Sequence, residues 1–252
     1  MAALTEYARD RHIDISPLVQ GLGHATFILK HDHYAPLREL PDNRWAFCPM
    51  DERTYEVLFD NYKDAIEATP GSHFIHIGGD EIGNIRLCKR CKSTTDEKGT
   101  SNLSLYWLNR VCAYVKEQGR VPIFWDDMPL KEAGVWQSTR QDIFTQVEIE
   151  EIWDTGRKKL NKILDRFPKD CIYMRWNYSM ANYPGNIEAM DWFQKNGLDM
   201  WIATAVNSAR ATLFPYDDRD KGIDNRGLAA IQSFIELASE KKNSGYACYG
   251  LG

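Results

Sequence analysis

Hydrophobic positions along this 252-residue chain follow two different periods. Apolar residues three and four positions apart predict helices that bury one face. These helices span residues 55–68, 103–118, 157–166, 187–196 and 228–242. Between them, short apolar runs bounded by turn residues predict strands. These strands span residues 13–20, 74–77, 121–125, 171–176, 198–205 and 246–251.

The alternation of strands and helices predicts an α/β fold with a parallel sheet, either an open doubly wound sheet or a (β/α)8 barrel. The glycine-rich turn of a dinucleotide-binding fold is missing after the first expected strand. Polar and aromatic residues follow several expected strands, and active sites of barrels collect at such ends. These residues are His24, Asp80, Glu81, Trp125, Asp126, Asp127, Trp176, Asn177, Tyr178 and Asn207. Residues 42–51 and 131–151 are expected to form loops over the face where these strand ends meet. A single domain over residues 1–252 is expected.

The most informative stretch is the hexapeptide HIGGDE at residues 76–81, which ends one expected strand. Neighbouring side chains of a strand point to opposite faces, so Asp80 and Glu81 reach one pocket only if the chain bends. Gly78 and Gly79 permit that bend at little steric cost. Paired acids at a strand end indicate acid/base chemistry, such as that used on sugars. The acidic first turn of a helix would explain the same residues equally well.

Composition limits the classes of partner. Apolar residues make up 43% of the chain and charged residues 27%, a balance typical of globular proteins. A net charge of −5 argues against nucleic acid or an anionic membrane as the main partner. No apolar run reaches the roughly 18 residues of a membrane helix, and residues 1–11 lack the apolar core of a secretory signal. A cytoplasmic protein is therefore expected, and its oligomeric state stays open.

Eight tryptophans and twelve tyrosines suit a carbohydrate site, because aromatic faces stack on sugar rings. Aromatic side chains also fill cores, and this is the role expected for Trp107 and Trp192, which fall on helical patterns. The aromatic content alone therefore leaves both interpretations open.

The six cysteines are spread along the chain in a way that does not suggest a disulfide framework. Cys88 and Cys91 form a lone Cys-x-x-Cys pair, and a structural zinc site would need two more ligands. Cys112 and His73 are candidates, but nothing in the sequence fixes them. We therefore expect reduced thiols, no metal and no cofactor. Residues 31–33, with the sequence HDH, have a metal-ligand spacing. They lie beyond the expected strand, in a segment predicted to be helical or looped, which favours a solvated turn.

Several stretches match one family in order along the chain. Besides the hexapeptide at residues 76–81, they are PLVQGLGH at 17–24, FWDDM at 124–128 and RWNY at 175–178. Together they resemble the signature, third, fifth and sixth strands of glycoside hydrolase family 20, the β-N-acetylhexosaminidases. The Cys-x-x-Cys after the signature resembles the branch of that family that includes hexosaminidase D. The resemblance covers nearly the whole chain.

The resemblance implies a TIM-type (β/α)8 barrel, of which this chain would hold strands three to eight. Two strands of the family barrel precede the segment that begins at Pro17. An arginine on the family's first strand grips sugar hydroxyls, and no residue here matches it. Residues 246–251 resemble strand eight, and the residues that usually follow it are absent. A partial barrel is therefore expected.

The resemblance also implies a reaction, the retaining removal of a terminal N-acetylhexosamine, in which the substrate's own acetamido oxygen is the nucleophile. Glu81 would be the general acid and then the general base, a role that requires a carboxyl pKa lifted towards neutral. Asp80 would stay ionised, accept the acetamido N–H and stabilise the cationic intermediate. The partner is then a glycan or glycoside that ends in N-acetylhexosamine.

Other residues matching the family motifs are implied to bind substrate. His24 would lie near the acid and help set its protonation. Trp125 and Trp176 would wall the sugar, Tyr178 would hydrogen-bond the acetamido oxygen, and Asp126 or Asp127 would bind a sugar hydroxyl. The alternative for His24 is an ordinary loop histidine. For the three aromatic residues it is core packing, and for one of the aspartates it is a helix cap.

Two other functions are compatible with the sequence. A truncated, catalytically silent sugar-binding fragment would follow from the missing strands and arginine, since an incomplete barrel leaves open strand edges. A metal-dependent barrel hydrolase would use the histidines of residues 31–33. The sequence does not distinguish glucosamine from galactosamine substrates.

Overall fold

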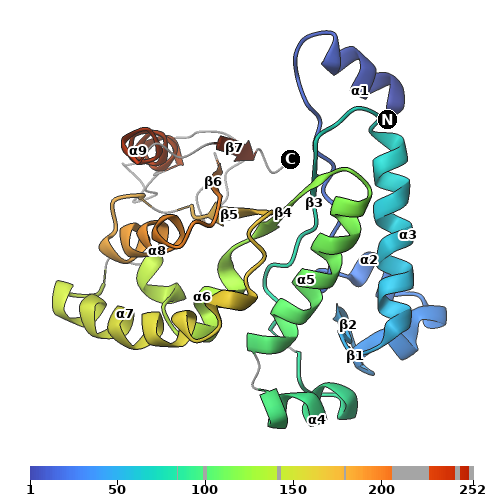
Figure 1. Ribbon diagram of the computed structural model, residues 1–252, viewed down its shortest axis with the longest axis horizontal. Helices are drawn as coiled ribbons and strands as arrows, with labels where there is room; N and C mark the ends of the chain where they lie inside the picture. Colours follow the sequence, from blue (N-terminus) through green and yellow to red (C-terminus); the bar gives the residue numbers. More distant parts are fainter. Residues whose placement is uncertain are drawn as a thin grey trace, which may run out of the picture. The chain divides into compact units, whose positions relative to one another are not determined.

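The structure is a computed structural model that describes residues 1–83, 85–98, 101–140, 143–178, 180–205, 227–241 and 245–249 (Figure 1). It divides into two compact units. The first comprises Met1–Met128 and Asp165–Ile172, and the second Pro129–Leu164 and Tyr173–Gly252. Among the helices described, none is long and apolar enough to cross a membrane.

The first unit combines several helices with short strands. Its helices are α1 (Ala2–Arg9), α2 (Thr26–Leu29), η1 (Asp32–Leu37), α3 (Glu52–Ala68), α4 (Lys89–Lys98), α5 (Ser101–Glu117) and most of η3 (Leu164–Arg166). Its strands are β1 (Arg38–Leu40), β2 (Asn43–Phe47), β3 (Phe74–His76) and β4 (Val121–Trp125). The helix α6 (Asp127–Ala133) starts where this unit ends.

Strands β3 and β4 pair in parallel, with Phe74 opposite Val121 and His76 opposite Ile123. The segment 13–20 was expected to be a strand, and this prediction was wrong. It contributes only an isolated parallel bridge between Leu18 and His76. Proline has no N–H to donate to a ladder, so Pro17 offers β3 only its carbonyl oxygen, which accepts from His76 N at 2.8 Å.

The prediction of a loop at residues 42–51 was also wrong, because β2 lies in this range and pairs with β1 as an antiparallel hairpin. Phe47 N donates to Leu22 O at 3.0 Å, and Ala25 N donates to Trp45 O at 2.9 Å. These bonds fix the hairpin against the segment around His24. The hairpin thus becomes part of the wall around the end of β3.

Helices α3 and α5 lie side by side (Figure 1) and confirm two of the predicted helices. Asp51 caps α3 by accepting from Arg53 N at 3.1 Å. The buried face of α3 includes Leu58 and Tyr62, and α5 buries Trp107, as its helical pattern predicted. This packing gives the first unit an apolar core beneath the end of β3.

The second unit holds a parallel run of three strands. Strand β6 (Met200–Ala205) lies between β5 (Ile172–Trp176) and β7 (Gly245–Tyr249). Its helices are η2 (Trp136–Thr139), α7 (Gln146–Asn161), α8 (Pro184–Lys195) and α9 (Gly227–Glu240). Trp192 of α8 is buried, as predicted.

The expected loop at residues 131–151 is wrong in part, since η2 and the start of α7 lie within it. Helix α7 begins well before the predicted residue 157, because a capping box sets its start. Thr145 Oγ1 accepts from Glu148 N, and the Glu148 carboxylate accepts from Thr145 N at 2.8 Å. The remaining predicted helices and strands agree with the structure to within a few residues.

Candidate active site at the carboxyl end of β3

The chain turns sharply where β3 ends. Gly78 and Gly79 adopt φ angles of +69° and +93°, so the expected bend occurs at the glycines. Neighbouring atoms also leave no room for a side chain at either glycine. A Cβ on Gly78 would lie 2.4 Å from Gln20 Oε1, and one on Gly79 would lie 3.0 Å from the Trp107 ring. Both glycines are therefore required by conformation and by packing.

The bend turns both acids of the hexapeptide towards one histidine. His24 Nε2 lies 3.2 Å from Asp80 Oδ2 and 3.5 Å from Glu81 Oε2. His24 and Glu81 both adopt left-handed backbone conformations, with φ angles of +52° and +50°. Such angles cost a non-glycine residue on the order of 1 kcal/mol and persist only where surrounding contacts impose them. The side-chain convergence is thus built into the backbone.

Two contacts hold the backbone of Glu81 in this conformation. Glu81 N donates to Asp127 Oδ2 at 3.0 Å, and Trp45 Nε1 donates to Glu81 O at 3.0 Å. The Trp45 ring also packs on His24, with ring centroids 4.0 Å apart. Trp45 and Asp127 therefore fix both the acid and the histidine.

The two acids lie in different environments. The Asp80 side chain is 16% exposed and that of Glu81 is 45% exposed. Burial raises the pKa of Asp80 to about 6; the nearby His24 lowers it, and the carboxylates of Asp127 and Glu81 raise it. The role expected for Glu81 requires a carboxyl pKa raised by partial burial or by a like charge. Of the two acids, the structure buries Asp80 more deeply.

His76, the first residue of the hexapeptide, is a neutral structural group. Its ring is buried, and its Nδ1 accepts from Gly78 N at 3.0 Å. Burial lowers the pKa of His76 to about 3, because no compensating charge offsets the desolvation of an imidazolium. The ring packs against Trp125 with centroids 4.3 Å apart. His76 thus links the bend to the end of β4.

The aspartates after β4 are both buried, with 0% exposure. The expectation that Asp126 or Asp127 binds a sugar hydroxyl stays a prediction. The contact to the acid pair comes from Asp127. Sequence reasoning missed Trp45, because the hairpin that carries it was assigned to a loop. The tryptophan in that loop was the available signal.

Trp176 and Tyr178 belong to the second unit, where they gather at the carboxyl end of β5. Their ring centroids are 5.5 Å apart, and the Trp136 ring lies 5.1 Å from Trp176. The Arg140 guanidinium lies 4.9 Å from the Trp176 ring centroid, within cation–π range. Asn207, also singled out from the sequence, lies outside the described residues.

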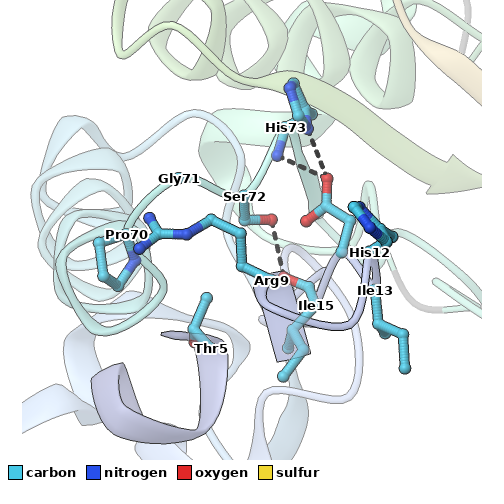
Figure 2. Close-up of a pocket in the computed structure, with 10 residues that line it drawn as sticks. Thr5, Arg9, His12, Ile13, Ile15, Pro70, Gly71, Ser72 and His73 are labelled. Atoms are coloured by element: carbon cyan, nitrogen blue, oxygen red, sulfur yellow. Dashed lines mark hydrogen bonds and ion pairs between the residues drawn. The ribbon is translucent and has the colours of Figure 1, made fainter. Parts of the chain in front are cut away.

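A separate cavity of about 250 Å³ lies at the other end of β3 (Figure 2). His73 and Ser72, which precede the strand, line it together with Arg9 and His12. His73 N and Nδ1 lie 2.9 Å and 2.7 Å from Asp14 Oδ2, the pair joined by dashed lines in Figure 2. Because barrel sites form at the carboxyl ends of strands, this cavity is not the candidate active site.

The cysteines of the Cys-x-x-Cys pair have neighbours that differ from those considered from the sequence. Cys88 and Cys91 lie beside Cys48 and Glu39. Cys112 instead contacts Cys171, and His73 contacts Asp14. The exposed residues 31–33 lie at the start of η1 and belong to no cluster of metal-ligating groups within the described part of the chain.

Paired carboxylates beside one histidine at the end of a parallel strand form an arrangement suited to acid/base chemistry in an α/β fold. The family model described as "Glycosyl hydrolase family 20, catalytic domain" matches residues 1–182. The chain belongs to glycosyl hydrolase family 20, as the sequence resemblance predicted.

Curated relatives agree with this assignment, and solved structures agree with the fold. Human Hexosaminidase D is 30% identical over 121 residues, which cover 46% of this chain and 25% of that protein. The chain thus spans about a quarter of the length of this relative. The β-N-acetylhexosaminidase from Bacteroides fragilis is 21% identical with a TM-score of 0.55, over 81% of this chain and 35% of that chain. Flavobacterium johnsoniae chitobiase is 16% identical with a TM-score of 0.58, over 98% of this chain and 33% of that chain. These neighbours imply a catalytic domain of the TIM-barrel type.

Proposed function

We propose that this chain carries the catalytic site of a retaining exo-β-N-acetylhexosaminidase that acts on glycans or glycosides ending in N-acetylhexosamine. The observation that carries the proposal is the convergence of Asp80 and Glu81 on His24 within the hexapeptide of the family. The reaction class comes from the family, and the division of labour comes from the different environments of the two acids. The proposal treats residues 1–252 as a single partial barrel domain.

Asp80 suits the role of holding the acetamido group. With a pKa of about 6 it is ionised at neutral pH, and its side chain is largely buried. A buried carboxylate can accept the acetamido N–H and hold the amide oxygen against the anomeric carbon. It also opposes the positive charge of the cyclised oxazolinium intermediate, at a site where water screens little.

Glu81 suits the proton transfer. Its carboxyl is the more exposed of the two, so a substrate can reach it, and the backbone bonds to Asp127 and Trp45 fix its direction. It would protonate the leaving glycosidic oxygen as the acetamido oxygen closes the ring. It would then remove a proton from the water that opens the oxazolinium, which returns the acid to its starting state and retains the configuration.

His24 would act through these carboxylates. Its Nε2 is within 3.5 Å of both acids, so its proton can stabilise the charge on either one as the reaction proceeds. The substrate-binding roles of Trp125, Asp126, Trp176 and Tyr178 stay predictions. Complete burial of Asp126 argues for a supporting role in which it does not touch the sugar.

Turnover of a chromogenic N-acetylglucosaminide by the full chain tests the proposal. Glu81→Gln keeps the shape of the side chain and removes its acidity, so kcat should fall by about 100-fold or more. Glu56→Gln, at an exposed position of α3, is the matched control and should retain full activity. Proton NMR of the first product should show the β-anomer. Full activity of Glu81→Gln would refute the assignment of the acid.

The nucleophile can be tested separately. Fluorination of the acetamido methyl group withdraws electrons from the amide oxygen, so the rate should fall with each fluorine added if that oxygen attacks. A rate insensitive to fluorination would contradict substrate assistance while leaving Glu81 as the acid. Sugar binding without turnover would instead favour the silent-fragment alternative. His31→Ala and His33→Ala should leave activity unchanged, and a loss in either would favour a metal-dependent hydrolase.

A further inference from the structure

A compact group of sulfur and oxygen atoms lies in the first unit, between the hairpin of β1 and β2 and the start of α4. Glu39 comes from β1, and Cys48 directly follows β2. Cys88 directly precedes α4, and Cys91 lies in its first turn. One ligand atom from each of these four residues lies within 4.8 Å of every other. The fold thus brings together three segments that are separate in sequence.

The distances match a metal site better than a disulfide. Cys48 Sγ lies 3.5 Å from Cys88 Sγ and 3.5 Å from Cys91 Sγ. Cys91 Sγ lies 3.1 Å from Glu39 Oε2. Tetrahedral zinc with bonds of about 2.3 Å to sulfur and about 2.0 Å to oxygen places two sulfurs about 3.8 Å apart and a sulfur and oxygen about 3.5 Å apart. A disulfide would require about 2.05 Å. Small shifts in the side chains would therefore admit the ion.

Glu39 is held in a way that leaves one oxygen for a ligand role. Its side chain is buried, and its Oε1 accepts from the backbone N–H groups of Arg86, Leu87 and Cys88 at 2.8, 2.7 and 3.0 Å. Its Oε2 faces the sulfur of Cys91. The three N–H bonds orient the carboxylate, as supporting hydrogen bonds do for metal ligands.

The electrostatics favour a cation in the same place. Glu39, Cys48 and Cys91 are buried, and Cys88 is partly buried. Arg90 hydrogen-bonds the Cys48 sulfur and also pairs with Asp51, with Nη1 3.0 Å from Oδ2. One guanidinium offsets only part of the charge of three thiolates and a carboxylate, so a divalent cation among the four ligand atoms would offset most of the remainder.

We propose that Glu39, Cys48, Cys88 and Cys91 bind one structural Zn²⁺, which replaces the thiol protons and is held by three thiolates and one carboxylate. Three sulfur ligands select a soft or borderline ion, and a closed set of four protein ligands is the arrangement of a structural site. Of these four residues, the sequence pattern singled out Cys88 and Cys91 as possible ligands, and the fold supplies Glu39 and Cys48.

The metal site would restrict the motion of the segment that carries Asp80 and Glu81. The ion would tie residues 86–88, a few positions after Glu81, to the hairpin of β1 and β2. The same hairpin carries Trp45, whose indole donates to Glu81 O. The zinc is therefore placed to hold the catalytic loop without touching the reacting atoms.

Metal analysis of the full chain, purified without chelators, tests the site. Mass spectrometry of the metals should find about one zinc per chain. Replacement by Co²⁺ should give the intense sulfur-to-cobalt charge-transfer bands of a tetrahedral thiolate site. Cys48→Ser and Cys91→Ser should lose most of the metal. Cys112→Ser, another buried thiol in the same unit, is the matched control and should keep it.

A failure of the cysteine variants to fold would not obscure the result, because the native chain gives its own readout. A mercurial reagent that releases zinc in step with the modified thiols supports the site. A native chain with no stoichiometric zinc, or with a disulfide among Cys48, Cys88 and Cys91, overturns it. Glu81→Gln should retain its zinc, so the metal site and the proposed hydrolase function are tested independently.

Discussion

The two ends of β3 carry two histidine–aspartate pairs, and the closer pair is not the candidate active site. At the amino end, His73 Nδ1 lies 2.7 Å from Asp14 Oδ2, with side chains 79% and 29% exposed. At the carboxyl end, His24 Nε2 lies 3.2 Å from Asp80 Oδ2, with side chains 28% and 16% exposed. A short distance between exposed groups contributes little, because water screens both charges. Burial and a second carboxylate distinguish the carboxyl end.

The two aspartates also respond oppositely to their surroundings. At Asp14, burial would raise the pKa, but hydrogen bonds from His73 N, Ser72 and the His73 ring outweigh it and lower the pKa. At Asp80, burial prevails and the pKa rises to about 6. Ionisation therefore stabilises the fold at one end of the strand and destabilises it at the other. Ionised Asp80 thus lowers the stability of the fold, but it places a negative charge where a cationic intermediate would form.

The largest expected difference is in turnover. Asp80→Asn should lower kcat by about 100- to 1,000-fold, because a neutral amide no longer opposes the charge of the oxazolinium. Asp14→Asn, the matched change at the amino end, should alter kcat by less than about twofold, since exposed pairs couple weakly. Initial-rate kinetics on the full chain measure both. Equal losses in the two variants would contradict the distinction between the ends.

The glycines of the two ends provide the next test. Gly78→Ala should lower the free energy of unfolding by about 2–4 kcal/mol, since φ is positive and the new Cβ would meet Gln20 and the backbone of Gly21. Gly71→Ala has a similar φ of +78°, but its Cβ would meet only the mobile end of Arg9 at 3.1 Å. Its cost should stay near 1 kcal/mol. Urea denaturation compares them, and a larger cost at Gly71 would be unexpected.

The histidines should differ by about 10- to 100-fold in their effect on kcat/KM. His24→Gln removes the group shared by Asp80 and Glu81. Outer-shell partners of metal ligands, which act by the same kind of orientation, have effects of this size. It should also shift the pH profile of kcat/KM, which a purely structural role would not do. His73→Gln should leave both rate and profile unchanged. An unshifted profile in His24→Gln would remove His24 from the mechanism.

The smallest expected effect is on stability, and its sign reverses between the ends. Between about pH 4 and pH 6, native Asp80 holds a proton that the unfolded chain has lost, so the free energy of unfolding falls as pH rises. Asp80→Asn should therefore stabilise the protein at pH 7, by about 1–3 kcal/mol. Asp14 contributes stability above its unfolded pKa that is lost as pH falls, so Asp14→Asn should destabilise by under about 1 kcal/mol. Thermal unfolding from pH 4 to pH 8 would show whether the signs differ.

The sequence by itself determined the elements whose pattern is local. Helical periodicity located α3 and α5, apolar runs located β3 and β4, and the two glycines of the hexapeptide predicted the bend. Each of these features depends on residues within a few positions of one another. The acid pair and His24 were likewise found from short motifs.

Only the tertiary structure decided which distant residues support those motifs. Trp45 and Asp127 meet Glu81 from positions 36 and 46 residues away. Glu39 and Cys48 meet the Cys-x-x-Cys pair through a hairpin that the sequence pattern assigned to a loop. No periodicity records such contacts, because they are set by how separate segments pack and by which buried polar groups find a partner.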